Sequence, residues 1–572
     1  MTGTIRRRGP DITGTWLSVL LLITNLVTVL LLPSIAGALL AAKAGRHPTG
    51  AELLRAYGDP NASRFPPPAV IALSVGLLLL LAAIDVPLLL HLRDRDQPRH
   101  VDSTARLWTR RADTLRVGTK SVRAAAEAIG YPVSTPGVYI GRSVRDGRDL
   151  WGSWEEVHVD ISGPRTGKTS CRVIPNIVSA PGAVVITSCK RDVVDATREV
   201  RRRQGRVWVF DPHNVVGEPP TWFWNPLDMV AGSMKEAASV AGLIAFTQRE
   251  QHMRSDGYFQ PAAENLLAMF LLAASLDEQP ITVVRRWLLR PNDEPATILR
   301  ASGYALAAEA CEATRNLPTP QRAGVYGTAI QMVSWLAAPE VLPWITPGQG
   351  REQFLHFEDF AIGTDTLYVV SDLDDRSAKP AASLLTAAIL AAAEYRAAAC
   401  SGGRLPVPFL VVLDEAANIA PLPILPDRLS HYGSRGLVVM VMLQSWAQGA
   451  HVWGENGMAK IWNAGSVRVY GAGGSEGALL SAHSLFSGKF EASTTTLAHR
   501  STAWWGSAWW DSSVTRATRP EFVLGVADLA ALPRDRMLVQ ISGGRPLLVR
   551  SVPWWEGPHA DAIRASIGRH GP

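Results

Sequence analysis

Residues 157–169 read VHVDISGPRTGKT, and this stretch is the strongest indication of the fold in the sequence. Its first five residues alternate apolar and polar side chains like a short strand, and the residues after it suit the start of a helix. A strand, a glycine-containing loop and a helix in this order are the context of a phosphate-binding loop. In such a loop, backbone N–H groups turn inward around phosphate oxygens beside a helix N-terminus.

The individual residues of this loop have predicted roles. Gly163 and Gly167 let the backbone turn, Lys168 reaches the β- and γ-phosphates, and the Thr169 hydroxyl holds Mg²⁺. The consensus asks for glycine at the first position, where this chain has Ser162. A chance Gly-Lys-Thr tripeptide in a turn is the alternative. The residues expected to contact nucleotide are Gly163, Pro164, Arg165, Thr166, Gly167, Lys168, Thr169 and Ser170.

Apolar runs recur downstream of the loop. They lie at 182–187, 206–210, 408–413 and 436–443, and a helix is expected over 193–204. Strands that alternate with helices indicate a parallel sheet with right-handed crossovers. The sequence therefore predicts an α/β fold, a P-loop nucleotide-binding domain with a parallel sheet.

Two acids follow the apolar run at 408–413. Asp414 and Glu415 would lie at the carboxyl end of a buried strand, where ligands bind in open α/β sheets. We expect Asp414 to hold the Mg²⁺ shell and Glu415 to polarise water for attack on the γ-phosphate. The alternative is an Asp-Glu pair that only caps the next helix.

Three further polar residues belong to the predicted catalytic set or compete for a place in it. Gln444 ends the run at 436–443, where it could sense the γ-phosphate or serve as an ordinary strand-end hydrogen-bonding group. Arg435 precedes the same run and is a candidate arginine finger for the nucleotide of a neighbouring subunit, with Arg428 as its rival. The predicted catalytic residues are thus Lys168, Glu415, Gln444 and Arg435, and the predicted metal ligands are Thr169 and Asp414.

The apolar content of the chain is concentrated in a few segments. Hydrophobic residues make up 47% of the 572 residues and charged residues only 19%, against about 25% in soluble domains, which argues against disorder and coiled coils. Two segments, about 14–42 and 69–92, are long enough to span a bilayer. Residues 93–149 hold twelve Arg and Lys against seven Asp and Glu, so we expect both termini of a two-pass cell-membrane protein to be cytoplasmic.

Several motifs carry a family resemblance. Residues 413–426 read LDEAANIAPLPILP, residues 444–448 read QSWAQ, and residues 173–176 read VIPN. Arg435-Gly436, FDP at 210–212, NPL at 225–227 and the segment 529–550 add to them. With these motifs and two membrane segments, the chain resembles the TraG/TraD-like coupling proteins of type IV secretion and conjugation systems.

The resemblance implies a membrane-bound, hexameric, RecA-like ATPase that uses ATP and Mg²⁺. Such proteins deliver a relaxase-bound DNA strand, or a protein substrate, to the secretion channel. The family also carries an all-helical domain inserted into the nucleotide-binding domain. The expected order is a membrane anchor at 1–92, a basic linker at 93–150, the nucleotide-binding domain at 151–228 and 347–552, the all-α insert at 229–346 and a tail at 553–572.

Two other functions compete with this one. A septal-translocase-type pump for double-stranded DNA usually carries a C-terminal winged helix, and no comparable basic module follows residue 550. A receptor that docks substrate at the membrane without hydrolysis is the second. Weaker signals are the arginine run 201–203, which we interpret as a solvated helix end rather than a DNA contact, and the tryptophan pairs within 504–510, which we expect to pack rather than stack on bases.

Overall fold

The computed structural model describes residues 100–131, 134–249, 257–354, 356–474, 477, 489–500, 511–522 and 524–571. From Thr104 onward these residues form one compact unit. The predicted membrane helices and the tryptophan pairs at 504–510 lie outside the described residues, so they stay predictions.

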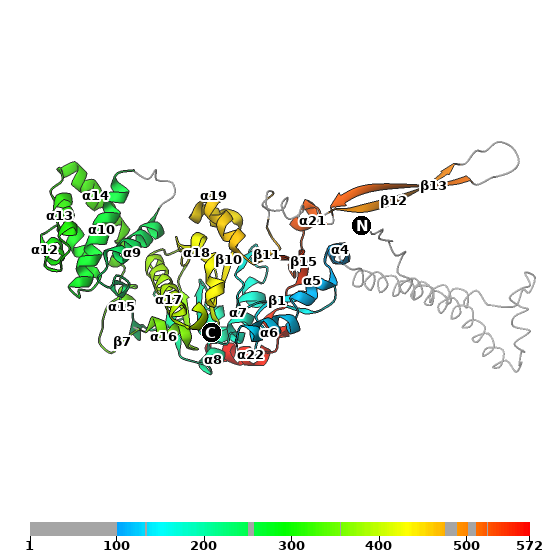
Figure 1. Cartoon of the computed structure of the whole chain (residues 1–572), viewed down its shortest axis with the longest axis horizontal. Coiled ribbons are helices and arrows are strands. Elements are labelled where there is room, and N and C mark those ends of the chain that lie inside the picture. The colour runs from blue at the N-terminus through cyan, green and yellow to red at the C-terminus, as the bar shows by residue number, and fades with distance from the viewer. Residues whose placement is uncertain are drawn as a thin grey trace, which may run out of the picture. The chain divides into compact units, whose positions relative to one another are not determined.

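An 11-stranded sheet is the main feature of this unit (Figure 1). Seven neighbouring strands run parallel, from β11 to β5, and four antiparallel strands continue the sheet beyond β11. In sheet order the strands are β2 (Asp149–Gly152), β1 (Val138–Ser143), β15 (Leu547–Arg550), β14 (Arg536–Ile541), β11 (Val467–Gly471), β3 (His158–Ile161), β10 (Leu437–Leu443), β9 (Phe409–Leu413), β4 (Val184–Ser188), β8 (Thr366–Val370) and β5 (Val207–Phe210).

The α/β fold is as predicted, but the prediction of a parallel sheet covers only part of it. The pairs β1–β2 and β14–β15 are antiparallel. Each pair is joined by a short turn that contains a glycine at positive φ, Gly147 (+72°) and Gly543 (+74°). A short turn joins two strands that run in opposite directions, so the predicted alternation of strands and helices does not extend to these two hairpins.

The central strands are buried on both faces. In β9, Phe409, Val411 and Leu413 belong to one hydrophobic cluster, and the alternate residues Leu410 and Val412 belong to another. This division follows from the two-residue period of a strand. It explains why the sequence of such a strand is apolar throughout.

Helices cover the two faces. The face of Leu410 packs against η1 (Thr169–Val173), α7 (Ile174–Ser179) and α8 (Asp192–Arg202), and α22 (Ala560–His570) packs on α8. The face of Val411 packs against α17 (Lys379–Ala399), α18 (Leu425–Tyr432) and α19 (Trp446–Ala464), and α16 (Phe357–Ile362) packs on α17.

A helical region separates β5 from β8 (green in Figure 1). The chain enters it through β6 (Trp222–Phe223) and returns through β7 (Glu352–Gln353), which pair in parallel. Its helices are η2 (Pro226–Met229), α9 (Met234–Gln248), α10 (Phe259–Leu276), α11 (Thr282–Leu289), α12 (Glu294–Ala301), α13 (Ala305–Arg315), α14 (Thr319–Met332), η3 (Ser334–Ala337) and α15 (Leu342–Ile345). Among the described helices, α10 alone is long and apolar enough to cross a membrane, and it packs as a core helix against α9 and α14.

The interpretation of residues 201–203 as a solvated helix end is wrong for Arg201. Its side chain is fully buried at the end of α8, and its guanidinium donates to the backbone oxygens of Ala180 and Gly182, both at 2.7 Å, and to Thr366 Oγ1 at 2.7 Å. Arg202 instead pairs with Glu199 at the surface. Burial lowers the pKa of Arg201 to about 10, which still leaves it charged at neutral pH.

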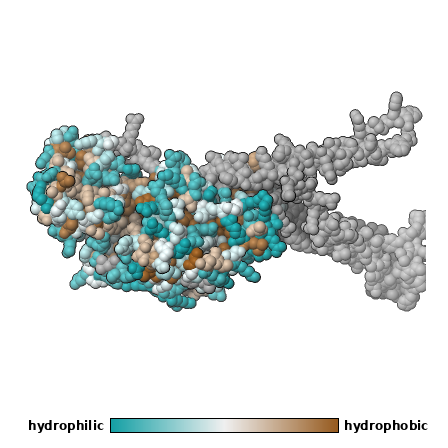
Figure 2. All heavy atoms as spheres, in the orientation of Figure 1, coloured by the Kyte–Doolittle hydropathy of each residue, from teal (hydrophilic) through white to brown (hydrophobic). Residues whose placement is uncertain are grey.

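The remaining described elements flank the sheet or pair with each other. On the face seen in Figure 2, hydrophilic residues cover most of the described surface, with hydrophobic residues scattered between them, as is usual for folded proteins. These elements are α4 (His100–Trp108), α5 (Arg111–Arg116), α6 (Thr119–Ala128), η4 (Ser401–Gly403), η5 (Gly433–Arg435), the hairpin of β12 (Lys489–Arg500) and β13 (Asp511–Phe522), α21 (Val526–Ala530) and η6 (Trp554–Glu556).

Candidate nucleotide site at the carboxyl edge of the sheet

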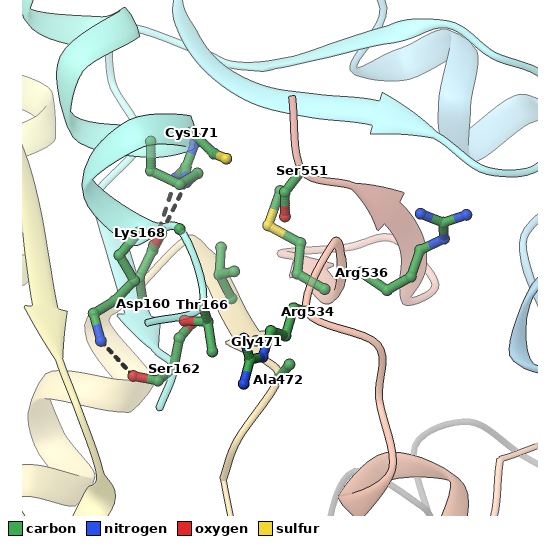
Figure 3. A pocket seen from close by; sticks show the side chains of 14 residues that line it. Asp160, Ser162, Thr166, Lys168, Cys171, Gly471, Ala472, Arg534, Arg536 and Ser551 are labelled. Atoms are coloured by element: carbon green, nitrogen blue, oxygen red, sulfur yellow. Dashed lines mark hydrogen bonds and ion pairs between the residues drawn. The ribbon is translucent and has the colours of Figure 1, made fainter. Parts of the chain in front are cut away.

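The predicted phosphate-binding loop lies between β3 and η1. Arg165 (φ +57°) and Gly167 (φ +88°) turn its backbone through the left-handed region. The Lys168 ammonium donates to the carbonyl oxygens of Ser162 and, at 3.2 Å, Gly163 (Figure 3). The loop thus curls around the amine of its own lysine.

Ser162 occupies the consensus glycine position because its neighbour on β11 is glycine. A Cβ placed on Gly471 would lie 2.2 Å from Ser162 Oγ. Ser162 itself is buried and has no positive φ. The Ser162 side chain therefore occupies the space that a side chain at position 471 would need. Serine is tolerated at 162 because residue 471 is glycine.

Neighbouring strands hold the loop in place. Ser162 N donates to the Leu443 oxygen at 3.1 Å at the end of β10, and Gly163 N donates to the Ala472 oxygen at 2.9 Å after β11. A Cβ on Gly163 would come within 2.7 Å of the Gly473 oxygen, so glycine is required there. The loop is fixed at its start, while Pro164 and Arg165 at its tip are exposed.

Asp414 and Glu415 follow β9 at the same edge of the sheet. Strand β10 lies between β9 and β3, so it separates the acids from the loop by one strand. Thr187 Oγ1 donates to the Asp414 carbonyl at 2.8 Å, which fixes the backbone there. Burial raises the pKa of Asp414 to about 7. The negative charge of Glu415 is the second contribution, and the charge of Lys168 opposes the shift.

Three side-chain amides surround the Glu415 carboxylate. Gln444 Nε2 donates at 2.6 Å, Asn418 Nδ2 at 3.2 Å and Gln448 Nε2 at 3.5 Å. Gln448 also accepts from the Gln444 backbone N–H at 2.9 Å, and it lies in the first turn of α19. Glu415 has a positive φ of +54°, so its backbone is strained for a residue with a side chain.

The structure thus brings Lys168, Asp414, Glu415 and Gln444 to one edge of the sheet. Burial lowers the pKa of Lys168, and Glu415 and Asp414 oppose that shift most strongly. Thr169 and Ser170 begin η1 directly after the lysine, and Ser170 Oγ donates to the Gly167 oxygen at 3.2 Å.

Arg435 does not join this group within one chain. It lies just before β10, and since β10 and β3 are parallel, that is the opposite edge of the sheet from the loop. Arg435 donates to the Glu394 carbonyl at 3.3 Å, and Arg428 lies 3.8 Å from the Glu394 carboxylate. A role in the site of a neighbouring subunit stays a prediction for either arginine.

A buried ion pair behind the loop was not predicted. Arg172 Nε lies 2.8 Å from Asp160 Oδ2, and the two side chains are 3% and 2% exposed. Arg172 also contacts His158 Nδ1 at 3.0 Å and the Tyr139 carbonyl. Burial, and next Arg172, lower the pKa of His158 well below its usual value, so the imidazole is neutral. The network fastens η1, after the loop, to β3, before it.

Comparisons with known proteins match parts of this chain to a protein family and to a curated protein. Residues 408–534 match the family described as "TraM recognition site of TraD and TraG". The chain is 22% identical over 321 residues to the type IV secretion system-coupling protein VirD4 of Bartonella quintana (strain Toulouse). Over these stretches the chain is similar to type IV coupling proteins. That alignment covers 52% of this chain and 47% of VirD4, so it spans about half the length of this relative.

Solved coupling-protein structures share the fold. The unbound monoclinic form of the bacterial conjugative coupling protein TrwBdeltaN70 matches with a TM-score of 0.52 and 15% identity, over 75% of this chain and 91% of that one. The plasmid coupling protein TrwB in complex with ADP and Mg²⁺ matches with a TM-score of 0.50 and 16% identity, over 70% and 86% of the two chains. At this identity the likeness establishes the α/β fold.

Chemically, the site suits a phosphate chain and a hard divalent cation. Lys168 and the loop N–H groups are donors for phosphate oxygens. Asp414 and Glu415 are neighbouring buried acids, so a cation beside Asp414 would offset their charge, and carboxylate and hydroxyl oxygens are ligands that Mg²⁺ prefers. Asp414 and Thr169 therefore fit the predicted metal role.

Proposed function

We propose that this chain is an ATPase of the coupling-protein class. One observation carries the proposal: a phosphate-binding lysine and two strand-end acids meet at one edge of a parallel sheet, with Gln444 bonded to the second acid. Support also comes from the relative TrwB, whose solved structures include complexes with ADP and Mg²⁺ and with a non-hydrolysable ATP analogue.

Each residue has a distinct task in the proposed reaction. Lys168 leaves the carbonyls of its own loop and neutralises the terminal phosphates, while Thr169 and Asp414 would hold Mg²⁺, which would supply further charge neutralisation. Glu415 orients and deprotonates the attacking water. Gln444 stands between Glu415 and the loop, where its amide can pass from the carboxylate to the γ-phosphate.

The amides around Glu415 define how its carboxylate is aimed. With Gln444 on Oε1, and Asn418 and Gln448 on Oε2, neither oxygen can rotate freely. A general base must lie within hydrogen-bond reach of the proton it takes. We propose that the amides keep Glu415 turned toward the place of the water.

We further propose that hydrolysis drives the delivery of a single DNA strand with its relaxase, or of a protein cargo, into a type IV secretion channel. This proposal is supported by the names of two relatives, the type IV secretion system-coupling protein VirD4 and the conjugative coupling protein TrwB. The proposal includes a two-pass anchor in the cell membrane, cytoplasmic termini and an active homo-hexamer. A reporter fused near Pro60 should behave as extracytoplasmic, and a cytoplasmic signal there would contradict the topology.

The test of the enzyme proposal compares ATP turnover by the purified full chain in detergent. Lys168→Ala should abolish steady-state hydrolysis, whereas Lys460→Ala, a matched change at an exposed lysine paired with Asp427, should leave it unchanged. Equal turnover in Lys168→Ala and the wild type would refute the assignment. Loss of turnover in Lys168→Ala while substrate transfer in cells continues would favour the non-hydrolysing receptor.

A second experiment addresses the cargo. Transfer in cells of a marked plasmid strand, scored with and without its relaxase, separates conjugative delivery from pumping of double-stranded DNA. Relaxase-dependent transfer that is lost in Lys168→Ala supports the proposal. Transfer that needs no relaxase would favour the septal-type pump.

A further inference from the structure

A narrow cleft opens beside the phosphate loop, on the side of β11. Its volume is about 20 Å³, and its lining includes Thr166 and Lys168 from the loop, Gly471 and Ala472 from the end of β11, and Arg534 from the segment before β14 (Figure 3). Neither Asp414 nor Glu415 lines it. The cleft is therefore a separate part of the site, next to the loop but away from the acids.

The strands on the two sides of the phosphate loop carry different residues. On one side of β3 lie β10 and β9, which carry Gln444 and the two acids, and on the other lie β11 and β14. The acids and Gln444 require the γ-phosphate on their side. Since a nucleoside triphosphate is a linear chain, its nucleoside must leave the loop on the β11 side, where the cleft lies.

Arg534 is a cation at this cleft that no described acid pairs with. It is exposed and has no ion-pair or hydrogen-bond partner among the residues that the structure describes. Asp160, the carboxylate that lines the cleft, is held by Arg172 at 2.8 Å.

Arg536 differs from Arg534 in two ways: it has an ion-pair partner, and its side chain points in another direction. Arg536 pairs with Asp535 at 2.6 Å. In Figure 3 its guanidinium points away from the loop, while Arg534 lies beside Gly471 and Ala472.

We propose that Arg534 holds the nucleoside end of the bound nucleoside triphosphate, with its guanidinium against the face of the base. This inference rests on the proposed ATPase function and adds a binding residue to the same site. A planar guanidinium stacks on aromatic rings as well as attracting them electrostatically. An exposed arginine at the edge of the cleft can reach over a base that leaves the loop on the β11 side.

The test measures nucleotide binding and turnover by the full chain in detergent. The variants are Arg534→Ala, Arg534→Lys and the control Arg545→Ala, an exposed arginine in the β14–β15 turn that does not line the cleft. We expect Arg534→Ala to weaken ATP binding and raise KM roughly tenfold, with kcat within about twofold of the wild type. Arg534→Lys keeps the charge but loses the planar group, so it should recover only part of the affinity.

Inorganic tripolyphosphate, which has no base, is the second probe, measured by displacement of a fluorescent ATP analogue. Its affinity should be equal in the wild type and Arg534→Ala. Unchanged ATP affinity in Arg534→Ala would overturn the inference, and so would an equal loss of ATP and tripolyphosphate binding. If Lys168→Ala abolishes ATP binding while Arg534→Ala does not weaken it, only this inference fails. If the wild type binds no ATP, the proposed function fails with it.

Discussion

Ser162 and Gly471 form a pair whose coupling can be measured. In Gly471→Ala the new methyl carbon would lie 2.2 Å from Ser162 Oγ and 2.8 Å from Ser162 Cβ. Ordinary contacts begin near 3.4 Å; the Ser162 hydroxyl can rotate but its Cβ cannot, so the two backbones must separate by several tenths of an ångström. Overpacking of this kind costs about 1–3 kcal/mol. The backbone at Gly471 has no positive φ, so the alanine causes no conformational strain of its own.

Ser162→Gly removes both clashing atoms. Alone it should cost about 0.5–1 kcal/mol through the entropy of glycine. In the double variant the methyl introduced by Gly471→Ala would face the Cα position of residue 162 at 3.6 Å, which is a normal contact. We therefore expect the double variant to be about as stable as Ser162→Gly, with a coupling free energy of about 1–3 kcal/mol.

The assay is a four-variant cycle of thermal unfolding and ATP affinity on the full chain. Gly471→Ala should lower Tm by roughly 2–6 °C and weaken ATP binding, because the start of the loop would shift. The double variant should regain most of both. If Gly471→Ala costs as much in the Ser162→Gly background as in the wild type, the two sites are independent and the packing explanation of Ser162 is wrong.

Three further predictions concern the surroundings of the site and the rest of the unit. Gln448→Ala should lower kcat about tenfold with little change in ATP affinity, because it removes one of the three amides on the Glu415 carboxylate and the acceptor of the Gln444 backbone N–H, and leaves the loop intact; an equal loss of ATP affinity would show that the change is not confined to Glu415. Asp160→Asn should destabilise the fold by about 3–5 kcal/mol, because it leaves the buried Arg172 unpaired; a loss below about 1 kcal/mol in denaturant unfolding would contradict this. Burial, and next Arg376, lower the pKa of Lys379 to about 8, so the unfolded state binds more protons between about pH 8 and 10.4 and stability should rise with pH there. Lys379→Met should remove that rise in Tm, and an unchanged rise would assign it to other groups.

The sequence predicts the catalytic edge of the sheet because its strands are buried on both faces. The runs at 408–413 and 436–443 became β9 and β10, and the polar residue that follows each run must lie at the carboxyl edge. A strand pattern alone does not give strand order. The structure supplies that order and has β10 between β3 and β9.

Other parts of the site depend on contacts that no local pattern records. Asn418 and Gln448 reach Glu415 only because the turn after β9 and the first turn of α19 meet in space. Arg534 lies far along the chain from Lys168, and nothing around it marks a binding residue. For Asp160 a signal existed: His158 and Asp160 alternate in a buried strand, so they share one face and need a buried partner, which is Arg172.

The proposed ATPase activity depends above all on Glu415, which would act on a nucleotide held by Lys168. Its most direct test is a single-turnover measurement on the full chain with ATP labelled at the γ-phosphate. Glu415→Gln should bind ATP as the wild type does and release labelled phosphate at least roughly 100-fold more slowly, while Glu358→Gln, a matched change at an exposed acid of α16, should behave like the wild type. Phosphate release from Glu415→Gln at the wild-type rate would contradict the role assigned to this carboxylate.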